Sequence, residues 1–171
     1  VKRYQLLSPG DKVAVCISGG KDSVVLAKLM QELQKHSEFP FELVFLVMDP
    51  GYNAENRKKI EENAEFLGIP ITVFETDIFS VADKTEQNPC YLCARMRRGH
   101  LYAKAKELGC NTVALGHHFD DVVETFMLNL FFEGRLGCFQ PVTYLSRIDL
   151  QLIRPMIYMP EKDVRYFASK A

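Results

Sequence analysis

Short apolar runs alternate along the chain with longer stretches in which apolar residues recur every three or four positions. The apolar runs predict strands at residues 12–17, 41–48, 71–75, 112–115 and 150–153. The helical period predicts helices at residues 23–35, 53–67, 94–108, 119–132 and 161–171. Strands that alternate with helices are typical of a parallel sheet with helices on both faces. We therefore expect one α/β domain with a Rossmann-like, doubly wound, five-stranded parallel sheet.

A polar turn joins the first predicted strand to the first predicted helix. Its residues are Ser18, Gly19, Gly20, Lys21, Asp22 and Ser23. Backbone N–H groups at a helix N-terminus favour phosphate, and glycines let a ligand approach the backbone closely. The serine hydroxyls can donate hydrogen bonds, the lysine adds positive charge, and the aspartate could hold Mg²⁺. The turn matches neither the Walker A spacing nor the Rossmann dinucleotide fingerprint, so an ordinary capped glycine turn stays an alternative.

Two other strand ends carry candidate binding residues. Asp49 follows the second strand, where the ribose or adenine of a nucleotide would lie in such a sheet, and main-chain groups of Val47 and Met48 could read the adenine edge. Asp-Pro-Gly is also a common turn, and the two interpretations are compatible. After the fourth strand, Gly116 permits close backbone approach, and His117 is a candidate for a phosphate or base contact.

An acidic block opens the helix that follows. Asp121 and Glu124 are three residues apart, so on a helix they share a face. Paired carboxylates beside a polyphosphate would repel it unless Mg²⁺ lies between them, which makes both residues candidate Mg²⁺ ligands. A favourable contact between Asp121 and the helix dipole is the alternative interpretation.

A Cys-x-x-Cys motif, Cys90 and Cys93, stands at a predicted helix start, and Arg95, Arg97 and Arg98 follow it. A helix N-terminus and nearby arginines lower the pKa of a thiol, which favours thiolate chemistry or metal binding. From the residues alone the pair fits a redox site, a zinc site, an iron–sulfur site or two free cysteines. The arginines fit phosphate contacts or a solvated helix face.

Composition limits the class of protein. The chain has 171 residues, 47% of them apolar, and a net charge of −1, which fits one globular domain without a global basic field. No apolar run approaches a membrane span, and we expect no membrane partner. Five cysteines without a secretory signal favour a reducing, cytoplasmic location. The last predicted helix lacks a stop signal, so we expect a domain over residues 1–171 that is truncated at its C-terminus.

The string Ser-Gly-Gly-Lys-Asp-Ser resembles the phosphate loop of the PP-loop ATP pyrophosphatases. These enzymes cleave ATP between its α and β phosphates and leave an adenylated intermediate. Residues 90–99, 114–125, 129–134 and 153–156 with 161–163 make the chain similar to one group among them, the tRNA-cytidine 2-sulfurtransferases.

The resemblance implies an ATP-dependent tRNA sulfurtransferase. Such an enzyme adenylates the C2 oxygen of an anticodon-loop cytidine, releases pyrophosphate, and lets sulfur displace AMP to leave 2-thiocytidine. It implies ATP and Mg²⁺ as cofactors, with Lys21 and Asp22 catalytic in the ATP loop. It also implies a [4Fe–4S] cluster on three cysteines, of which Cys90 and Cys93 match two and the third would lie beyond Ala171. The implied partners are tRNA and a sulfur donor, a cysteine desulfurase, with the arginines on RNA or ATP phosphates.

Two alternatives remain at this stage. A lysidine synthetase-like enzyme, or another PP-loop enzyme, would adenylate a different acceptor, although the Cys-x-x-Cys motif weighs against it. A nucleotide-binding module without turnover would only need the binding residues. A homodimer is also open, since it would complete an RNA-binding surface that a chain of neutral charge lacks.

Overall fold

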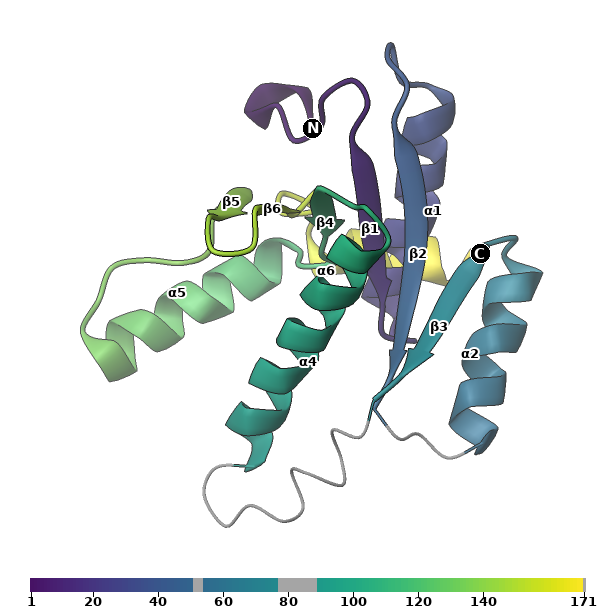
Figure 1. The fold of residues 1–171 in the computed structure, drawn as a ribbon. Helices are drawn as coiled ribbons and strands as arrows, with labels where there is room; N and C mark the ends of the chain where they lie inside the picture. The colour runs from purple at the N-terminus through teal and green to yellow at the C-terminus, as the bar shows by residue number, and fades with distance from the viewer. Residues whose placement is uncertain (51–53, 77–88, 171) are drawn as a thin grey trace.

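The computed structural model describes residues 1–50, 54–76 and 89–170, the side chains of Lys2 and residues 89–94 excepted. After a short 3₁₀ turn η1 (Lys2–Tyr4), strands and helices alternate along the chain (Figure 1). The strands are β1 (Lys12–Ile17), β2 (Glu42–Asp49), β3 (Ile71–Glu75), β4 (Thr112–Ala114), β5 (Val142–Leu145) and β6 (Leu150–Ile153). The helices are α1 (Lys21–Lys35), α2 (Ala54–Phe66), α4 (Pro89–Glu107), α5 (Phe119–Glu133) and α6 (Glu161–Ala168).

The strands form one sheet in the order β3-β2-β1-β4-β6-β5, and every pair except β5–β6 is parallel. The chain moves from β1 to β2 on one side and later returns to β4 on the other, so the strand order reverses between β1 and β4. Parallel α/β sheets bind ligands outside the carboxyl ends of the strands at such a reversal. The turn after Ile17 and the loop after Ala114 both lie there.

The doubly wound α/β fold predicted from the sequence is confirmed, with a correction to the number of strands. The sheet has six strands, because β5 pairs antiparallel with β6 at the edge, from Val142 opposite Ile153 to Leu145 opposite Leu150. Strand β5 has four residues and none of them is fully buried. A short, half-exposed edge strand produces no continuous apolar run, which is why the pattern did not reveal it.

Side-chain alternation along β1 sends apolar residues to both faces of the sheet. Val13, Val15 and Ile17 pack in a cluster with residues of α1, α2 and α6. Ala14 belongs to the opposite cluster, which α4 covers, and Cys16 packs against that cluster. The central strand is therefore buried on both sides, and its carboxyl end is held rigidly where the site is built.

Helix boundaries differ from the predicted ones where end signals decide them. Helix α4 begins at Pro89, five residues before the predicted start, because proline suits the first turn of a helix. Helix α6 ends at Ala168, where the Ser169 N–H donates to the Arg165 carbonyl. Helix α5 runs outward from the sheet with no buried residue, and Phe132 near its end is 82% exposed. Among the described residues, no helix is long and apolar enough to cross a membrane.

Candidate functional site

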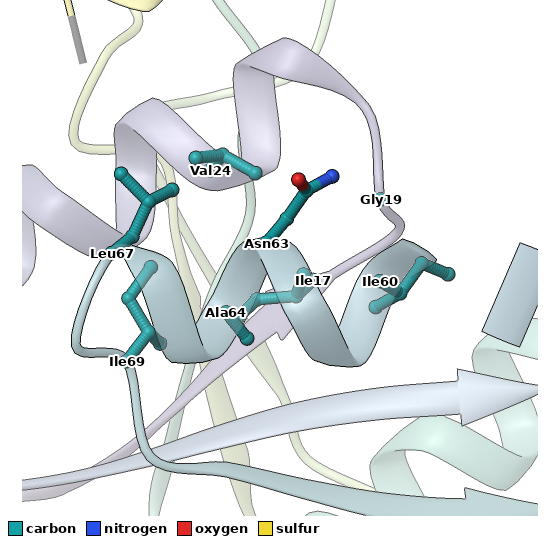
Figure 2. A pocket seen from close by; sticks show the side chains of 8 residues that line it. All are labelled: Ile17, Gly19, Val24, Ile60, Asn63, Ala64, Leu67 and Ile69. Atoms are coloured by element: carbon teal, nitrogen blue, oxygen red, sulfur yellow. The ribbon is translucent and has the colours of Figure 1, made fainter. Parts of the chain in front are cut away.

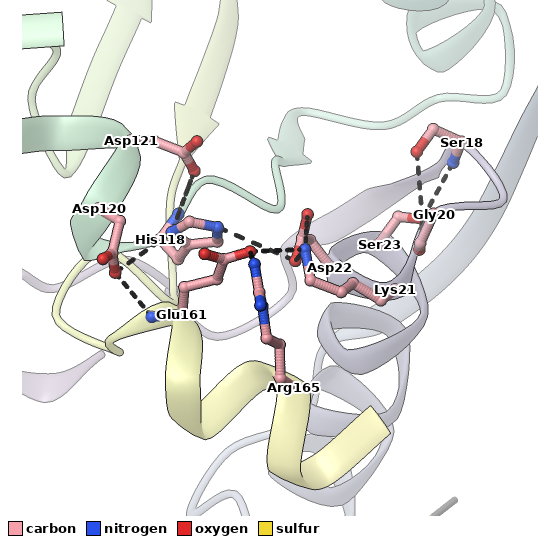
Figure 3. Close-up of polar contacts among 10 residues, drawn as sticks. All are labelled: Ser18, Gly20, Lys21, Asp22, Ser23, His118, Asp120, Asp121, Glu161 and Arg165. Carbon is pink, nitrogen blue, oxygen red and sulfur yellow. Dashed lines mark hydrogen bonds and ion pairs between the residues drawn. The ribbon is translucent and has the colours of Figure 1, made fainter. Parts of the chain in front are cut away.

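The turn between β1 and α1 is held by the buried hydroxyl of Ser23. The Ser18 N–H donates to Ser23 Oγ at 3.1 Å, and Ser23 Oγ donates to the Gly20 carbonyl at 2.8 Å (Figure 3). Gly20 is the N-cap of α1 and has no side chain that could occupy the helix N-terminus. The N–H groups of the first turn of α1 thus have no intrahelical partner and no side-chain cap, which leaves an anion-binding helix end.

Gly19 takes a left-handed backbone conformation and lies against α2. Its φ is +82°, and a Cβ built there would lie 3.0 Å from Ile60 Cγ1. A cavity of about 20 Å³ separates the turn from α2, and Figure 2 shows Ile17, Val24 and Asn63 among the side chains around it. This volume suits about one water molecule, so the turn packs closely on α2. The other side of the turn faces the starts of α5 and α6, from which His118 and Glu161 approach it.

Lys21 lies between two carboxylates from different helices. Its Nζ is 3.1 Å from Asp22 Oδ1 and 3.1 Å from Glu161 Oε1, at the start of α6 (Figure 3). These contacts, Asp22 first, raise the pKa of Lys21. Glu161 also pairs with Arg165 at 2.9 Å, and Arg165 and then Lys21 lower its pKa. Lys21 therefore carries a full positive charge, and its partners are partly exposed side chains that can be exchanged for another anion.

His118 is a buried imidazole at the centre of the site. It precedes α5, is 6% exposed, and has its Nε2 3.9 Å from Asp22 Oδ1. Its Nδ1 lies 3.5 Å from Asp121 Oδ2 and 3.8 Å from Asp120 Oδ2 (Figure 3). The three carboxylates surround the ring, so His118 connects the turn after β1 to the start of α5.

The same carboxylates fasten the ends of the neighbouring helices. Asp121 Oδ2 accepts the His118 N–H at 2.7 Å, and Asp120 Oδ2 accepts the Glu161 N–H at 2.6 Å, at the first residue of α6. Gly116 brings the loop after β4 against α1, since a Cβ there would lie 3.4 Å from the Asp22 carbonyl group. The N-termini of α1, α5 and α6 therefore meet in one small volume.

The end of β2 lies beside this volume in the sheet. Strand β1 stops at Ile17, opposite Val47, so Met48 and Asp49 extend beyond it. Asp49 is the last residue of β2, is 5% exposed, and has its Oδ2 3.8 Å from Arg57 NH1. The main chain of Met48 thus reaches past the paired part of β1, where the predicted adenine edge would lie.

Comparison with known families settles the class of this domain. Residues 2–171 match the family described as a PP-loop domain. The chain belongs to the PP-loop family. The resemblance assigns the turn from Ser18 to Ser23 as the PP-loop of this domain, and we use that name for it.

Two curated relatives are named tRNA-cytidine(32) 2-sulfurtransferase. The protein from Alkalilimnicola ehrlichii is 38% identical over 173 residues, which cover 99% of this chain and 55% of the relative. The protein from Citrifermentans bemidjiense is 37% identical over 171 residues, with coverage of 98% and 67%. The chain thus spans about half to two thirds of the length of these relatives.

Solved structures with the same fold include a tRNA-modifying enzyme. The U34-tRNA thiolase NcsA from Methanococcus maripaludis, with its [4Fe–4S] cluster, superposes with a TM-score of 0.76 at 28% identity, covering 96% of this chain and 57% of the thiolase. An NAD⁺ synthetase from Burkholderia pseudomallei superposes with a TM-score of 0.57 at 17% identity, covering 94% and 65%, and shows the shared fold alone.

The two predicted metal-binding carboxylates, Asp121 and Glu124, have different surroundings on α5. Asp121 faces His118, whereas Glu124 is exposed one turn along α5 and makes no hydrogen bond or ion pair with any described residue. Within residues 1–50, 54–76 and 89–170, no three His, Cys, Asp or Glu side chains gather as metal ligands do. Asp22 Oδ1 is buried and pairs with the Lys21 ammonium at 3.1 Å without a well-aligned hydrogen bond, so this oxygen could serve as a metal ligand if the lysine turned to another anion.

The predicted cluster cysteines lie at the start of α4. The backbone places Cys90 and Cys93 in the first two turns, but their side chains lie outside the described part of the structure. Burial raises the pKa of Cys16, well above the ordinary thiol range, and that of Cys110. Thiols with raised pKa values stay protonated and are poor metal ligands, so Cys16 and Cys110 are poor candidates for the cluster.

Residues that sequence analysis did not single out complete the site. His118 and Glu161 contact Asp22 and Lys21 from segments far along the chain, and no local pattern predicts such contacts. His117 points to a different neighbour: its ring lies 4.8 Å from Phe139, and burial, then the charge of Arg154, lower its pKa. His117 is therefore a neutral imidazole at ordinary pH.

Proposed function

We propose that this PP-loop domain binds ATP and serves an ATP-dependent tRNA sulfurtransferase that converts a cytidine of the anticodon loop into 2-thiocytidine. The observation that carries the proposal is the PP-loop itself, an uncapped helix N-terminus beside Lys21 at the reversal of strand order. The curated relatives at 37–38% identity, named for this reaction, support the choice of product.

The first step forms an adenylate. The C2 oxygen of cytosine attacks the α-phosphorus of ATP, a new P–O bond forms, and the bond from the α-phosphorus to the bridging oxygen breaks to release pyrophosphate. In the second step, sulfur at the oxidation level of sulfide adds to C2 and the C2–O bond breaks, so AMP leaves with the former cytosine oxygen. The PP-loop N–H groups and Lys21 stabilise the negative charge that develops on pyrophosphate.

ATP would enter by exchanging partners at Lys21. In the present structure the lysine is paired with Asp22 and Glu161, both on the rim of the PP-loop. A triphosphate offers Lys21 a stronger anionic partner, and the Glu161 carboxylate then turns to Arg165 alone. Ser18, Gly19 and Gly20 would contact the phosphates through their backbone, Ser23 would keep the loop closed, and Gly116 with His117 would border the α-phosphate.

We place the base of ATP at the end of β2. Main-chain groups of Val47 and Met48 would read the adenine edge, and Asp49 would face the ribose. Mg²⁺ would bind between the phosphates and carboxylates, with Asp22, Asp121 and Glu124 as its candidate ligands, where it would neutralise the leaving pyrophosphate.

The sulfur step needs a second group of residues. Cys90 and Cys93, in the first two turns of α4, would hold a [4Fe–4S] cluster together with a cysteine beyond Ala171. When bound, the cluster supplies an iron site that accepts sulfur. Arg95, Arg97 and Arg98, further along α4, would contact RNA phosphates. A cysteine desulfurase in the cytoplasm is the proposed sulfur source, and a homodimer is the proposed assembly.

The test is pyrophosphate release and nucleoside analysis with the full-length protein, prepared without oxygen, on unmodified tRNA. We expect ATP-dependent release of pyrophosphate and one 2-thiocytidine per tRNA, with both lost in Lys21→Met. Arg3→Met, which removes an exposed cation from the 3₁₀ turn before β1, is the matched control and should retain activity. Binding of ATP without any pyrophosphate release would refute the enzyme and favour a nucleotide-binding module.

The product separates this proposal from a lysidine synthetase-like reaction. That reaction shares the adenylation step, but an amine then attacks C2, so pyrophosphate alone does not distinguish the two. Detection of a lysine adduct instead of 2-thiocytidine would assign the other acceptor. For the cluster, the measurement is iron content, and thiolation retained without iron would refute the cluster proposal.

A further inference from the structure

A second concave surface lies between α4 and the β5–β6 hairpin, away from the PP-loop. The cleft has a volume of about 1020 Å³, at the upper end of the range for small-molecule sites. Five of its lining residues are cationic: Arg95, Arg98, Lys106, Arg147 and Arg154. The cleft concentrates positive charge that the net charge of −1 conceals.

Carboxylates leave most of these cations uncompensated. Lys106 Nζ lies 3.6 Å from Asp149, on the rim of the hairpin. Arg95, Arg98 and Arg147 are exposed and make no ion pair with any residue in the described part of the chain. Unpaired cations that share one concave wall attract a polyanion, because a low-dielectric cleft focuses their field.

Arg154 forms the inner end of the cleft and lacks a hydrogen-bond partner at one nitrogen. It is 7% exposed, and it donates through NH1 to the Gln140 carbonyl and Thr143 Oγ1. Its Nε is buried, with no acceptor among the described residues. A buried guanidinium N–H that is left unpaired is costly, so this atom is suited to an oxygen supplied by a ligand.

The cleft leads towards the PP-loop. The guanidinium of Arg154 lies 4.9 Å from the Phe139 ring, which in turn lies 4.8 Å from the His117 ring. His117 follows Gly116, whose backbone packs on Asp22. A strand held in the cleft would therefore have one end beside the proposed adenylation site.

We infer that this cleft binds the phosphate backbone of an RNA strand next to the reacting base, an inference that rests on the proposed function. Arg95 and Lys106 are eleven residues apart on α4, which is about 16 Å along a helix, so the cations suit successive phosphates better than a single one. Tyr102, half-buried between them, offers a ring on which an unstacked base can stack.

The experiment measures binding of unmodified tRNA, without ATP, by fluorescence anisotropy over a range of salt concentrations. The variant is Arg98→Gln with Arg147→Gln, two exposed residues whose removal leaves the core intact. The matched control is Arg135→Gln with Arg3→Gln, which removes the same charge outside the cleft. We expect weaker binding of the cleft variant and a loss of about 1.4 from the slope of log K against log salt, from about 0.7 per single-strand phosphate contact.

Arg154→Lys provides a second test of the inference, because lysine keeps the positive charge but lacks the Nε donor. It should weaken tRNA binding with little change in the salt slope. Equal affinities and salt slopes for the cleft variant and its control would overturn the inference. It would also be overturned if the cleft substitutions weakened binding of an acidic protein and left binding of RNA unchanged. Pyrophosphate release is assayed separately, so tRNA binding through the cleft without turnover would refute the proposed function and leave the cleft site standing.

Discussion

Gly19→Ala should destabilise the fold through two separable terms. The first is conformational: an alanine at φ +82° enters the left-handed region, which disfavours L-residues by about 1–2 kcal/mol. The second is steric: the new Cβ would lie 3.0 Å from Ile60 Cγ1 and 3.1 Å from its Cδ1. Carbon atoms prefer separations of about 3.5–4.0 Å, so Ile60 must move.

The structure bounds the steric term. Overpacking costs about 1–3 kcal/mol, and Ile60 borders a cavity of about 20 Å³ into which it can shift. We take the lower end of the range for the steric term, about 1 kcal/mol. Added to the conformational term, this brings the expected loss in the free energy of unfolding of Gly19→Ala to about 2–3 kcal/mol. Gly10 is the matched control, because it also has φ +82° but a Cβ there would meet nothing within 4 Å. Gly10→Ala should lose only the conformational term.

The assay is urea unfolding of the two single variants, of Ile60→Ala, and of the double variant. Ile60→Ala should cost about 1 kcal/mol less in the Gly19→Ala background than in the wild type, because the coupling term of the double-mutant cycle isolates the contact. Equal losses for Gly10→Ala and Gly19→Ala, with no coupling to Ile60, would refute the reasoning. ATP binding by calorimetry should weaken only in Gly19→Ala, where the PP-loop shifts.

Three further outcomes follow from the site. Ser23→Ala should lower the free energy of unfolding by about 1–3 kcal/mol in urea, because the Ser18 N–H and the Gly20 carbonyl lose their buried partner; an unchanged midpoint would contradict this. Glu161→Gln should tighten ATP binding modestly at low salt and less at high salt, since Glu161 competes with the triphosphate for Lys21 and a solvent-accessible ion pair is screened by salt; Glu133→Gln, paired with Arg135, is the control that should bind ATP as wild type does. The lowered pKa of His117 means that the unfolded chain takes up a proton which the folded chain does not, so stability should fall as pH drops below 6.5, and His117→Gln should flatten urea midpoints between pH 7.5 and 5.5.

Local signals in the sequence were enough for the fold and for the turn that joins β1 to α1. Buried parallel strands such as β1 and β2 read as continuous apolar runs, and the glycines at 19 and 20 mark the turn that follows β1. Strand β5 was not predicted from the sequence because it lies at an edge of the sheet and is half exposed. A signal for this strand does exist in the sequence. The short Val-Thr-Tyr-Leu segment lies just before the apolar strand β6, and the short connection between the two segments fits a hairpin.

Long-range contacts could not be predicted from those signals. Glu161 meets Lys21 only because α6 packs beside α1, and Arg154 meets Phe139 only through the β5–β6 edge. The three arginines of α4 were considered as one group, yet Arg95 and Arg98 line the cleft while Arg97 does not. A helix turns 100° per residue, so neighbours in sequence point apart, and which of them face a cleft depends on what packs beside the helix.

The convergence of three helix N-termini explains why so many carboxylates gather at this site. Helices α1, α5 and α6 each place a positive dipole end in the same volume, and each supplies an acidic residue in its first turn: Asp22, Asp121 and Glu161. Asp121 and Asp120 accept backbone N–H groups and keep α5 and α6 in place, whereas Asp22 and Glu161 compensate Lys21. Anchoring and charge compensation thus fall to different carboxylates, so a triphosphate can displace the second pair without releasing the helices that shape its site.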